Sequence, residues 1–542
     1  MRGLMQNRQL LISNILSHAE TYHHDVPVVS LLVEGGKVTS SYGRIARRAR
    51  QVAQALQRDG IGLGDRVATL AWNTHRHVEA WYGISGMGAI THTVNPRLFD
   101  EQIAYIINHA EDRLLLLDLS FVALVERLAP QLASIERYVI LTDAEHMPKT
   151  SLKNAIAYED WIASEDGDYA WPMLDENTAS GLCYTSGTTG NPKGVLYSHR
   201  ATVLHSYAAS MADTLAIAAR DSVLPIVPMY HANAWGVPYS ATAVGAKMVL
   251  AGPHFDAPTL HKLILDEGVT VTAAVPTIWL GLLNHLEATG GDVDCLERVT
   301  IGGSAAPRAM IEAFENRYGV AVFHAWGMTE MSPLGTIGSL NRKGLSLTRE
   351  KQIDLKCKQG RVVFGVEMKI VDDDGKELPR DGKAFGHLLV RGPWITSGYF
   401  KGEGGPAVDA EDWFDTGDVA TLDGDGYMQI TDRAKDVIKS GGEWISSIEL
   451  ENAAVGHPAV AEAAVIGVPH PKWDERPLLI LVKKNGAEVT KDAIIDFLRP
   501  QIAKWWLPDD VVFVDEIPHT ATGKIQKLTL RSRFRDYKLP GA

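Results

Sequence analysis

Residues 184–195 form a segment whose composition suits phosphate binding. They read Tyr-Thr-Ser-Gly-Thr-Thr-Gly-Asn-Pro-Lys-Gly-Val. Glycines let the backbone turn tightly and bring N–H groups close to an anion, while hydroxyls and a lysine ammonium supply further donors for phosphate oxygens. The segments on either side read as strands, so we predict a phosphate-binding loop between two strands. The residues expected to contact phosphate are Thr185, Ser186, Gly187, Thr188, Thr189, Gly190 and Lys193.

The loop differs from the Walker type of nucleotide-binding loop. A Walker loop has four residues between its first glycine and a Gly-Lys pair, and a serine or threonine follows the lysine. Here Lys193 follows Pro192 and precedes Gly194. A polar surface loop is the alternative interpretation. We favour nucleotide binding because so many hydroxyls and glycines surround a central lysine.

Further motifs follow this loop along the chain. They are GGSAAP at 302–307, WGMTE at 326–330, WFDTGD at 413–418, DRAKD at 432–436, KSGGEWI at 439–445 and TATGKI at 520–525. In type and order they resemble those of the adenylate-forming enzymes, which include acyl-CoA synthetases, aryl-CoA ligases, firefly-type luciferases and peptide-synthetase adenylation domains. The resemblance extends from about residue 30 to about residue 530, and several motifs in order are far more specific than one.

The resemblance implies that the chain joins a carboxylic acid to the thiol of CoA. ATP would convert the acid to an acyl-adenylate with release of diphosphate, and the thiol would then displace AMP. The loop would hold the β- and γ-phosphates, Thr329 would contact the α-phosphate, and Thr185 and Glu330 would bind Mg²⁺. Lys524 would stabilise charge on the α-phosphate and the attacking carboxylate, an effect that can contribute about 10²–10³ in rate.

The remaining nucleotide and CoA contacts are also implied by the resemblance. Trp326 would stack on the adenine, Asp418 would bind the ribose hydroxyls, and Arg433 would make a second contact to ribose or phosphate. Lys435 matches a hinge position, and Gly441 and Gly442 would line a narrow tunnel for pantetheine. The other residues expected at the nucleotide or CoA are Gly303, Ser304, Ala305, His324, Ala325, Gly327, Lys439, Glu443 and Trp444.

The acid is predicted from residues 229–235, Met-Tyr-His-Ala-Asn-Ala-Trp. They resemble a segment of bacterial fatty acyl-CoA synthetases in which the tryptophan gates an alkyl tunnel. Trp235 would be the gate, His231 would act near the carboxylate, and Gly302 and Pro333 would line the pocket. The expected pocket segments offer no lysine or arginine for a second acidic group, which favours an aliphatic or thioether monocarboxylate. Medium-chain fatty acyl-CoA ligases and 3-(methylthio)propanoyl-CoA ligases are the most similar groups, and the sequence does not separate them.

Two other functions share these motifs. An adenylating enzyme that loads an acyl carrier protein would keep every nucleotide-binding residue and differ only in its acceptor. A non-catalytic adenylate-binding protein or an oxygen-dependent, luciferase-like protein is the second alternative. The presence of Lys524, Glu330 and Lys435 argues against a non-catalytic protein.

The elements that must position these residues read as α/β. Strand-like runs at 66–70, 114–117, 248–251 and 269–274 alternate with helical periodicity at 42–59 and 102–109. From about residue 360, short strands separated by Asp-Gly turns indicate a small β subdomain, with one strand expected over 361–370. We therefore predict parallel α/β subdomains and a small β subdomain in an N-terminal domain, 1–432, and a mobile α+β C-terminal domain, 433–542, that carries the catalytic lysine.

Composition excludes several classes of protein. With 53 basic and 66 acidic residues the formal charge of the 542-residue chain is −13, which argues against nucleic acid as a partner. Three separated cysteines indicate neither a disulfide framework nor a zinc site. No apolar run reaches the roughly 18 residues of a membrane span, and no secretory signal is evident. We expect a cytoplasmic enzyme that acts on small molecules and, by resemblance, possible pairing as a homodimer.

Overall fold

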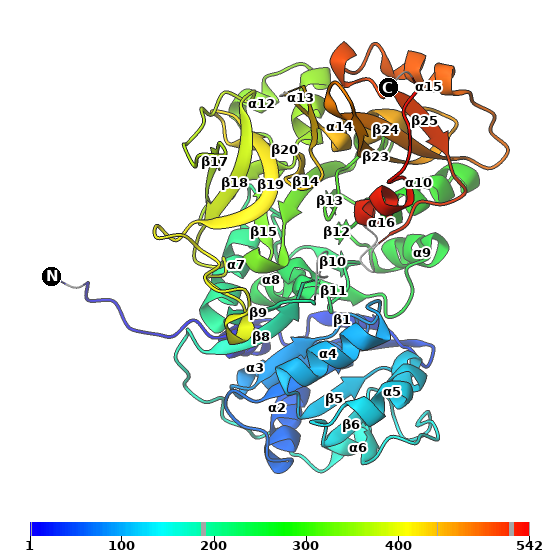
Figure 1. The fold of residues 1–542 in the computed structure, drawn as a ribbon. Coiled ribbons are helices and arrows are strands. Elements are labelled where there is room, and N and C mark those ends of the chain that lie inside the picture. The colour runs from blue at the N-terminus through cyan, green and yellow to red at the C-terminus, as the bar shows by residue number, and fades with distance from the viewer. Residues whose placement is uncertain (2, 186–190, 442, 520–524, 541–542) are drawn as a thin grey trace.

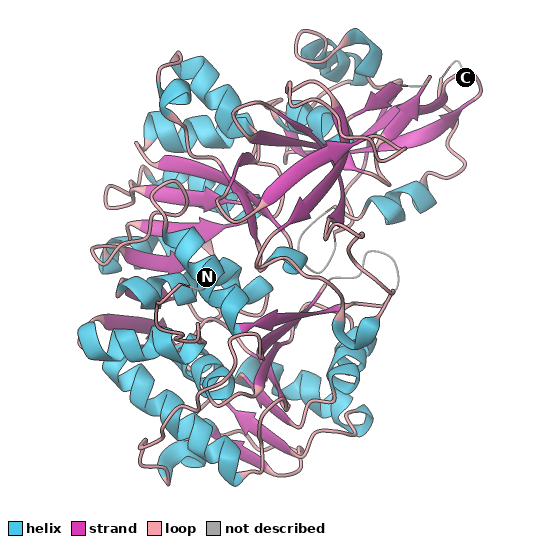
Figure 2. Cartoon of the chain, turned by 90° about the vertical axis from the view of Figure 1, so that its left-hand side faces the viewer, coloured by secondary structure: helices cyan, strands magenta, loops and turns pink. Residues whose placement is uncertain are grey.

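The structure is a computed structural model, and it describes all residues except 2, 186–190, 442, 520–524 and 541–542. The molecule contains three sheets that lie one after another along its length, with helices mainly on their outer faces (Figures 1 and 2). The first two sheets belong to the larger, N-terminal part of the chain. The third belongs to the C-terminal part, drawn in orange and red at the top of Figure 1.

The first sheet has seven strands in the order β7-β6-β5-β3-β4-β8-β9. All neighbours are parallel except β8 and β9, which form an antiparallel hairpin. Its strands are mostly buried, as expected for a parallel sheet covered by helices. Their bounds are β3 Arg66–Leu70, β4 Ile90–Thr93, β5 Leu114–Leu117, β6 Arg137–Ile140, β7 Ala155–Ala157, β8 Ala179–Tyr184 and β9 Gly194–Ser198.

The second sheet has thirteen strands and changes character along its length. Strands β1, β11, β10, β12, β13 and β14 are parallel neighbours, whereas β15, β16, β20, β19, β18 and β17 are antiparallel. At the other edge, β2 pairs antiparallel with β1. The bounds are β1 Pro27–Leu31, β2 Lys37–Ser41, β10 Ser222–Pro225, β11 Lys247–Leu250, β12 Val271–Ala274, β13 Arg298–Ile301, β14 Ala321–Gly327, β15 Leu334–Ile337, β16 Gly360–Val362, β17 Glu367–Val371, β18 Phe385–Arg391, β19 Phe414–Leu422 and β20 Tyr427–Arg433.

The β-rich region is therefore continuous with the second α/β sheet, because β14 pairs on one side with β13 and on the other with β15. The expectation of one strand over 361–370 was wrong. The structure has two strands, β16 and β17, separated by Gly365 with a φ of +104°. A side chain there would also collide with the ring of Trp394, since a Cβ would come within 2.3 Å of it.

Helices cover the first two sheets, and the α/β prediction is confirmed. Helix α2 contributes a row of apolar residues to the core between the sheets, including Ile45, Ala49 and Val52. The helices are α1 Ile12–Tyr22, α2 Tyr42–Arg58, α3 His75–Gly86, α4 Asp100–Ala110, α5 Val122–Leu128, α6 Tyr158–Ala163, α7 His199–Ser210, α8 Val237–Val244, α9 Ala257–Glu267, α10 Pro276–Thr289, α11 Arg308–Glu312, α12 Arg342–Leu345 and α13 Arg349–Cys357. None of the helices in the described ranges is both long enough and apolar enough to span a bilayer.

The C-terminal part is a small α+β unit with its own core. Its sheet has the order β22-β21-β24-β23, and β25 pairs with β24. Buried Ile438, Val465 and Leu479 pack against Leu450 and Ile494 from the helices. The elements are β21 Ile438–Ser440, β22 Glu443–Ile445, α14 Ser447–Val455, β23 Val460–His470, β24 Asp474–Lys483, α15 Lys491–Leu498, β25 Asp510–Phe513 and α16 Lys527–Arg533.

Candidate active site

The predicted phosphate loop connects β8 to β9, between two strands as expected. Its two ends are joined by hydrogen bonds: the Thr185 N–H donates to the Lys193 carbonyl at 2.9 Å, and the Lys193 N–H donates to Thr185 Oγ1 at 3.1 Å. This clamp fixes the base of the loop. Ser186, Gly187, Thr188, Thr189 and Gly190 lie outside the described residues, so their phosphate contacts stay predictions.

Glu330 lies beside this loop, although the two are far apart in the sequence. It belongs to a short 3-10 turn, Thr329–Met331, and is 8% exposed. Oε1 of Glu330 accepts a hydrogen bond from the Tyr399 hydroxyl at 3.0 Å. The Lys193 Nζ lies 4.8 Å from the centroid of the same tyrosine ring. One aromatic side chain therefore contacts both the predicted metal carboxylate and the predicted phosphate-binding lysine.

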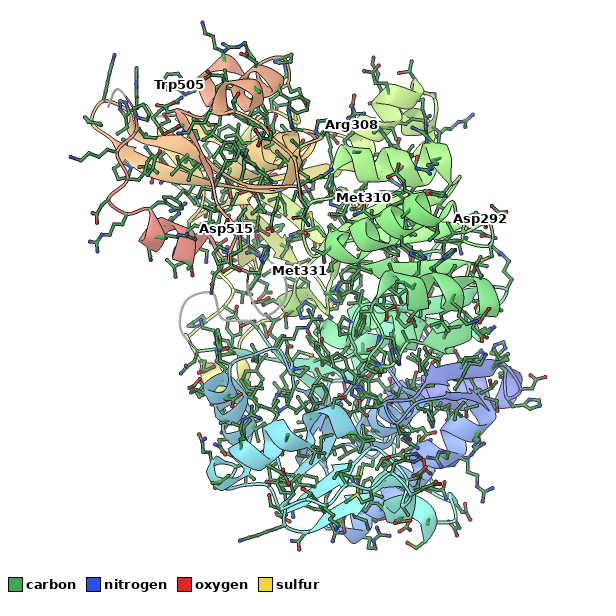
Figure 3. All side chains as sticks on the ribbon, turned by 90° about the vertical axis from the view of Figure 1, so that its right-hand side faces the viewer. Asp292, Arg308, Met310, Met331, Trp505 and Asp515 are labelled. Atoms are coloured by element: carbon green, nitrogen blue, oxygen red, sulfur yellow. The ribbon has the colours of Figure 1, made fainter. Side chains whose placement is uncertain are left out.

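Backbone contacts hold the turn that carries Thr329 and Glu330. The Tyr197 hydroxyl, on β9, donates to the Thr329 carbonyl at 2.6 Å, and the Thr396 N–H donates to the Glu330 carbonyl at 2.8 Å. Burial raises the pKa of Tyr197, which therefore stays a hydrogen-bond donor. Figure 3 shows Met331, the residue after Glu330, below the C-terminal elements that carry Trp505 and Asp515.

The predicted metal ligands fit magnesium in their chemistry. Mg²⁺ prefers oxygen ligands, commonly one or two carboxylates together with phosphate oxygens and waters. Glu330 supplies a carboxylate with one oxygen oriented by Tyr399. The Thr185 hydroxyl, which accepts one hydrogen bond from the loop backbone, is a second oxygen donor at the loop base. Thr185 and Glu330 could therefore hold the metal.

The predicted nucleoside end of the site is organised around Asp418 on β19. This carboxylate is 2% exposed, and Oδ2 accepts a hydrogen bond from the Trp326 indole N–H at 3.0 Å. Oδ1 pairs with Arg433 Nε at 2.9 Å. The two oxygens of a carboxylate suit the two hydroxyls of a ribose, and that contact stays a prediction. The predicted adenine platform and the predicted ribose ligands are thus in direct contact.

Trp326 is itself held in a tight site. A Cβ on Gly335 would lie only 2.5 Å from its ring, so the glycine leaves the space that the indole fills. Trp326 is 7% exposed. Its neighbours Ala325 and Gly327 end strand β14 at the edge of the parallel part of the sheet.

His324 supports the 302–307 turn from beneath. Its ring is fully buried, its Nε2 accepts from the Ala306 N–H at 3.3 Å, and its Nδ1 lies 3.2 Å from the Cys357 carbonyl. Burial lowers the pKa of His324 to about 4, so the ring is neutral near pH 7. Within the turn, Gly303 has a φ of +83° and Ser304 is exposed. Nucleotide contacts by Gly303, Ser304, Ala305 and His324 stay predictions.

The predicted acyl pocket contains an unusual backbone turn. Ala232, Asn233, Ala234 and Trp235 all have positive φ values, 41°, 53°, 49° and 56°, and Gly236 follows at 73°. Non-glycine residues seldom adopt this left-handed conformation, which costs roughly 1–2 kcal/mol for each. The turn directs the Trp235 ring toward Gly302, where a Cβ would come within 3.0 Å of the indole. The structure therefore brings Trp235 and Gly302 together, and their role in an acyl pocket stays a prediction.

Sequence reasoning missed the histidine that supports this turn. His205, on α7, is buried, and its Nε2 accepts from the Leu334 N–H at 3.2 Å, next to Pro333. The same ring lies against Gly236, where a Cβ would come within 2.7 Å. Burial lowers the pKa of His205 to about 4. The ring is neutral near pH 7 and cannot supply a cation for a second acidic group.

The contacts of His231 and of several C-terminal residues stay predictions. His231 is half-buried immediately before the left-handed turn, and Lys435 is exposed after β20. Gly441 has a φ of +61°, and a Cβ there would meet the ring of Trp473 at 3.1 Å and that of Trp505 at 3.4 Å. These two tryptophans were not predicted. Lys439 lies on β21, Glu443 and Trp444 lie on β22, and Gly442 and Lys524 fall outside the described residues.

Comparison with known proteins agrees with this geometry. Residues 16–400 match the family described as AMP-binding enzyme, and residues 449–524 match the AMP-binding enzyme C-terminal domain. The chain is 51% identical to a 3-methylmercaptopropionyl-CoA ligase of Ruegeria pomeroyi, over 99% of both chains. It is 48% identical to a medium-chain-fatty-acid–CoA ligase of Ectopseudomonas oleovorans, over 99% of this chain and 98% of the other.

A solved structure is similar over the same length. The crystal structure of the anthranilate CoA ligase AuaEII in complex with anthranoyl-AMP superposes with a TM-score of 0.87 at 25% identity, over 99% of both chains. The family predicted from the motifs is confirmed, and this chain belongs to the AMP-binding enzyme family.

Proposed function

We propose that this chain is an AMP-forming acyl-CoA ligase. The observation that carries the proposal is the cluster of Lys193, Glu330 and Tyr399, which sets a phosphate-binding cation beside a buried carboxylate. Asp418 and Trp326, which are hydrogen-bonded to each other, would form the nucleoside site. A triphosphate nucleotide fits this arrangement, with its phosphates at the loop and its ribose at Asp418.

The reaction has two halves. In the first, an oxygen of the acid attacks the α-phosphate of ATP, diphosphate leaves, and an acyl-adenylate forms. Lys193 would hold the β- and γ-phosphates, Thr329 would contact the α-phosphate, and Lys524 would stabilise the charge that develops there. A bound Mg²⁺, held by Thr185 and Glu330, would neutralise phosphate charge. In the second half, the CoA thiol attacks the acyl carbon and AMP leaves.

The two halves need different surroundings, which supports a division into domains 1–432 and 433–542. Lys524 belongs to the C-terminal domain and the phosphate loop to the N-terminal one. Closure would place the lysine for adenylation. A swing about Lys435 would then withdraw it and admit pantetheine past Gly441, Gly442 and their neighbours Lys439, Glu443 and Trp444.

We further propose a short- or medium-chain aliphatic acid, or a methylthio-alkanoic acid such as 3-(methylthio)propanoate, as the substrate. The names of the two relatives support these classes. The residues predicted to line the pocket also support these classes, because Trp235, Gly302 and Pro333 are apolar. The buried His205 nearby is neutral. A thioether and a methylene have similar size and polarity, so the same pocket suits both. We place the enzyme in the cytoplasm, and pairing as a homodimer stays a prediction.

The test is ATP- and CoA-dependent release of AMP with a panel of acids: acetate, butanoate, hexanoate, octanoate, palmitate, 3-(methylthio)propanoate and benzoate. An optimum between C4 and C8 would support a fatty acid, and an optimum at the thioether acid would support sulfur-compound breakdown. Acid-dependent release of diphosphate from ATP without CoA-dependent turnover would favour an acyl carrier protein as acceptor and overturn the ligase proposal.

A further inference from the structure

A strap, residues 396–405, crosses from the second sheet to the first. It follows β18 and passes beside the β8–β9 hairpin, where Figure 1 shows it in yellow. Two polar contacts fasten its far end to α4 and the residue that follows it: the Tyr105 hydroxyl donates to Glu403 Oε1 at 2.9 Å, and Lys401 pairs with Glu111 at 2.5 Å. Phe400 also packs beside Leu182 and Ala110. The strap thus bridges the two sheets at the phosphate loop.

Tyr399 is the strap residue that reaches the predicted chemistry. Its hydroxyl donates to Glu330 Oε1, and its ring face carries the Lys193 ammonium. The strap backbone encloses that ammonium from another side, since a Cβ on Gly404 would come within 2.8 Å of Lys193 Nζ. Hydroxyl and ring therefore contact different partners, one from the turn after β14 and one from the hairpin of the first sheet.

The two contacts have different physical effects. A hydroxyl that donates to one carboxylate oxygen orients the group and leaves the other oxygen for a metal. The ring face attracts a cation and so restrains a flexible lysine that would otherwise sample many rotamers.

We infer that Tyr399 is a positioning residue that orients the metal-binding carboxylate of Glu330 through its hydroxyl and the phosphate-binding ammonium of Lys193 through its ring. The inference rests on the proposed function, because it takes Glu330 and Lys193 to be the metal and phosphate ligands. It predicts that the two roles can be separated by substitution. Removing the hydroxyl should weaken the response to magnesium, and removing the ring should in addition weaken nucleotide binding when magnesium is saturating.

The experiment measures calorimetric binding of α,β-methylene-ATP to the full chain at a series of MgCl₂ concentrations, without acid or CoA. This analogue cannot be split between its α- and β-phosphorus atoms, so binding is read without turnover. For Tyr399→Phe we expect the Mg²⁺ concentration that gives half-maximal binding to rise about tenfold or more, with unchanged affinity at saturating Mg²⁺. For Tyr399→Leu we expect the same rise and a further loss of about two- to fivefold in saturated affinity.

Tyr105→Phe is the matched control. It also removes a tyrosine–carboxylate hydrogen bond and loosens the same strap, but it touches neither Glu330 nor Lys193. We expect it to keep the wild-type magnesium response. An equal shift in Tyr105→Phe would mean that fastening of the strap, not the Tyr399 hydroxyl, is responsible, and would overturn the inference. A wild-type magnesium response in Tyr399→Phe would also overturn the inference.

A double substitution tests whether Tyr399 acts through Glu330. In a Glu330→Gln background, Tyr399→Phe is expected to change binding less than twofold, since the carboxylate that it orients is already gone. If Tyr399→Phe weakened binding in the Glu330→Gln background as much as it does in the wild-type protein, the inference would be contradicted. The proposed function fails separately: wild-type protein that binds the analogue with magnesium yet forms no acyl-CoA would refute the ligase and leave the role of Tyr399 intact.

Discussion

The nucleotide site and the joint to the C-terminal domain are built in opposite ways. At the nucleotide site, side chains from several elements hold one another: Trp326 and Arg433 hold Asp418, and Tyr399 holds Glu330. At the joint, the contacts converge on one strand end. Ser446 and Ser447 donate to Thr431 and Asp432 at the end of β20, and α14 packs against that strand.

This difference fits the different tasks proposed for the two regions. A site that stabilises charge during adenylation gains most when its groups are already in position before the reaction. A domain that must change orientation gains from a joint in which few residues absorb the rotation. The buried cluster of Asp432, Ser447, Glu451 and Lys527 holds the C-terminal helices against the strand end in this arrangement. A swing about Lys435 would separate Asp432 from the other three. The exposed Lys435 follows the strand end.

The largest effect should come from Lys524→Ala. If Lys524 acts only in adenylation, the variant loses at least about 10²–10³ in the rate of adenylation, measured as acid-dependent exchange of diphosphate into ATP. Formation of acyl-CoA from a supplied acyl-adenylate should remain largely intact. Lys484→Ala, in the same domain and exposed, is the control. If Lys524→Ala slowed adenylation and acyl-CoA formation equally, Lys524 would not act in adenylation alone.

Asp432→Ala should weaken the joint itself. Its buried carboxylate accepts from the Ser447 N–H and hydroxyl, and the Lys527 ammonium lies 4.0 Å away. Removing one member of a buried charge cluster costs about 3–5 kcal/mol of stability. We therefore expect the C-terminal domain to unfold at a lower urea concentration, as measured by amide hydrogen exchange. Ser447→Ala, which keeps the carboxylate, should cost about 1 kcal/mol. Similar losses in both variants would argue against a charge cluster.

Trp326→Phe tests the preformed nucleotide site. Phenylalanine keeps an aromatic face but cannot donate to Asp418, and a hydrogen bond to a charged group contributes about 1.5 kcal/mol or more, roughly tenfold in affinity. We expect ATP-analogue affinity to fall by about that factor while the thermal midpoint changes little. Trp413→Phe is the control, since that indole contacts Lys369 and Arg391. An unchanged affinity would show that the indole N–H does not organise Asp418.

Trp235→Ala should have the smallest effect and should change selectivity. Loss of the ring against Gly302 lengthens the apolar pocket, and each newly buried methylene contributes about 0.8 kcal/mol, close to fourfold. The chain-length profile of AMP release should therefore move toward longer acids, whereas Trp235→Phe should move it less. If the chain-length profile of Trp235→Ala were the same as that of the wild-type protein, Trp235 would not line the acyl pocket.

Much of the fold followed from local patterns in the chain. The strands at 66–70 and 114–117 and the helix that begins at Tyr42 lie where periodicity predicted them, because apolar spacing reports which face of an element is buried. The failure at 361–370 has a physical cause. Both halves of that range are strand-like, and only the packing of Trp394 over Gly365 shows where the chain must turn between β16 and β17.

The sequence by itself determined the family and the candidate ligands, because phosphate, ribose and metal each require particular residue types at short spacing, and those motifs are local. Only the tertiary structure decided which residues position those ligands. Tyr399 lies 69 residues from Glu330, Trp326 lies 92 from Asp418, and His205 lies 129 from Leu334. A tyrosine after a glycine, or a histidine on a helix, carries no local signal of its partner. Those pairs form only when the two sheets and the strap pack together, and the burial that results raises the pKa of Tyr399 and lowers the pKa of His205.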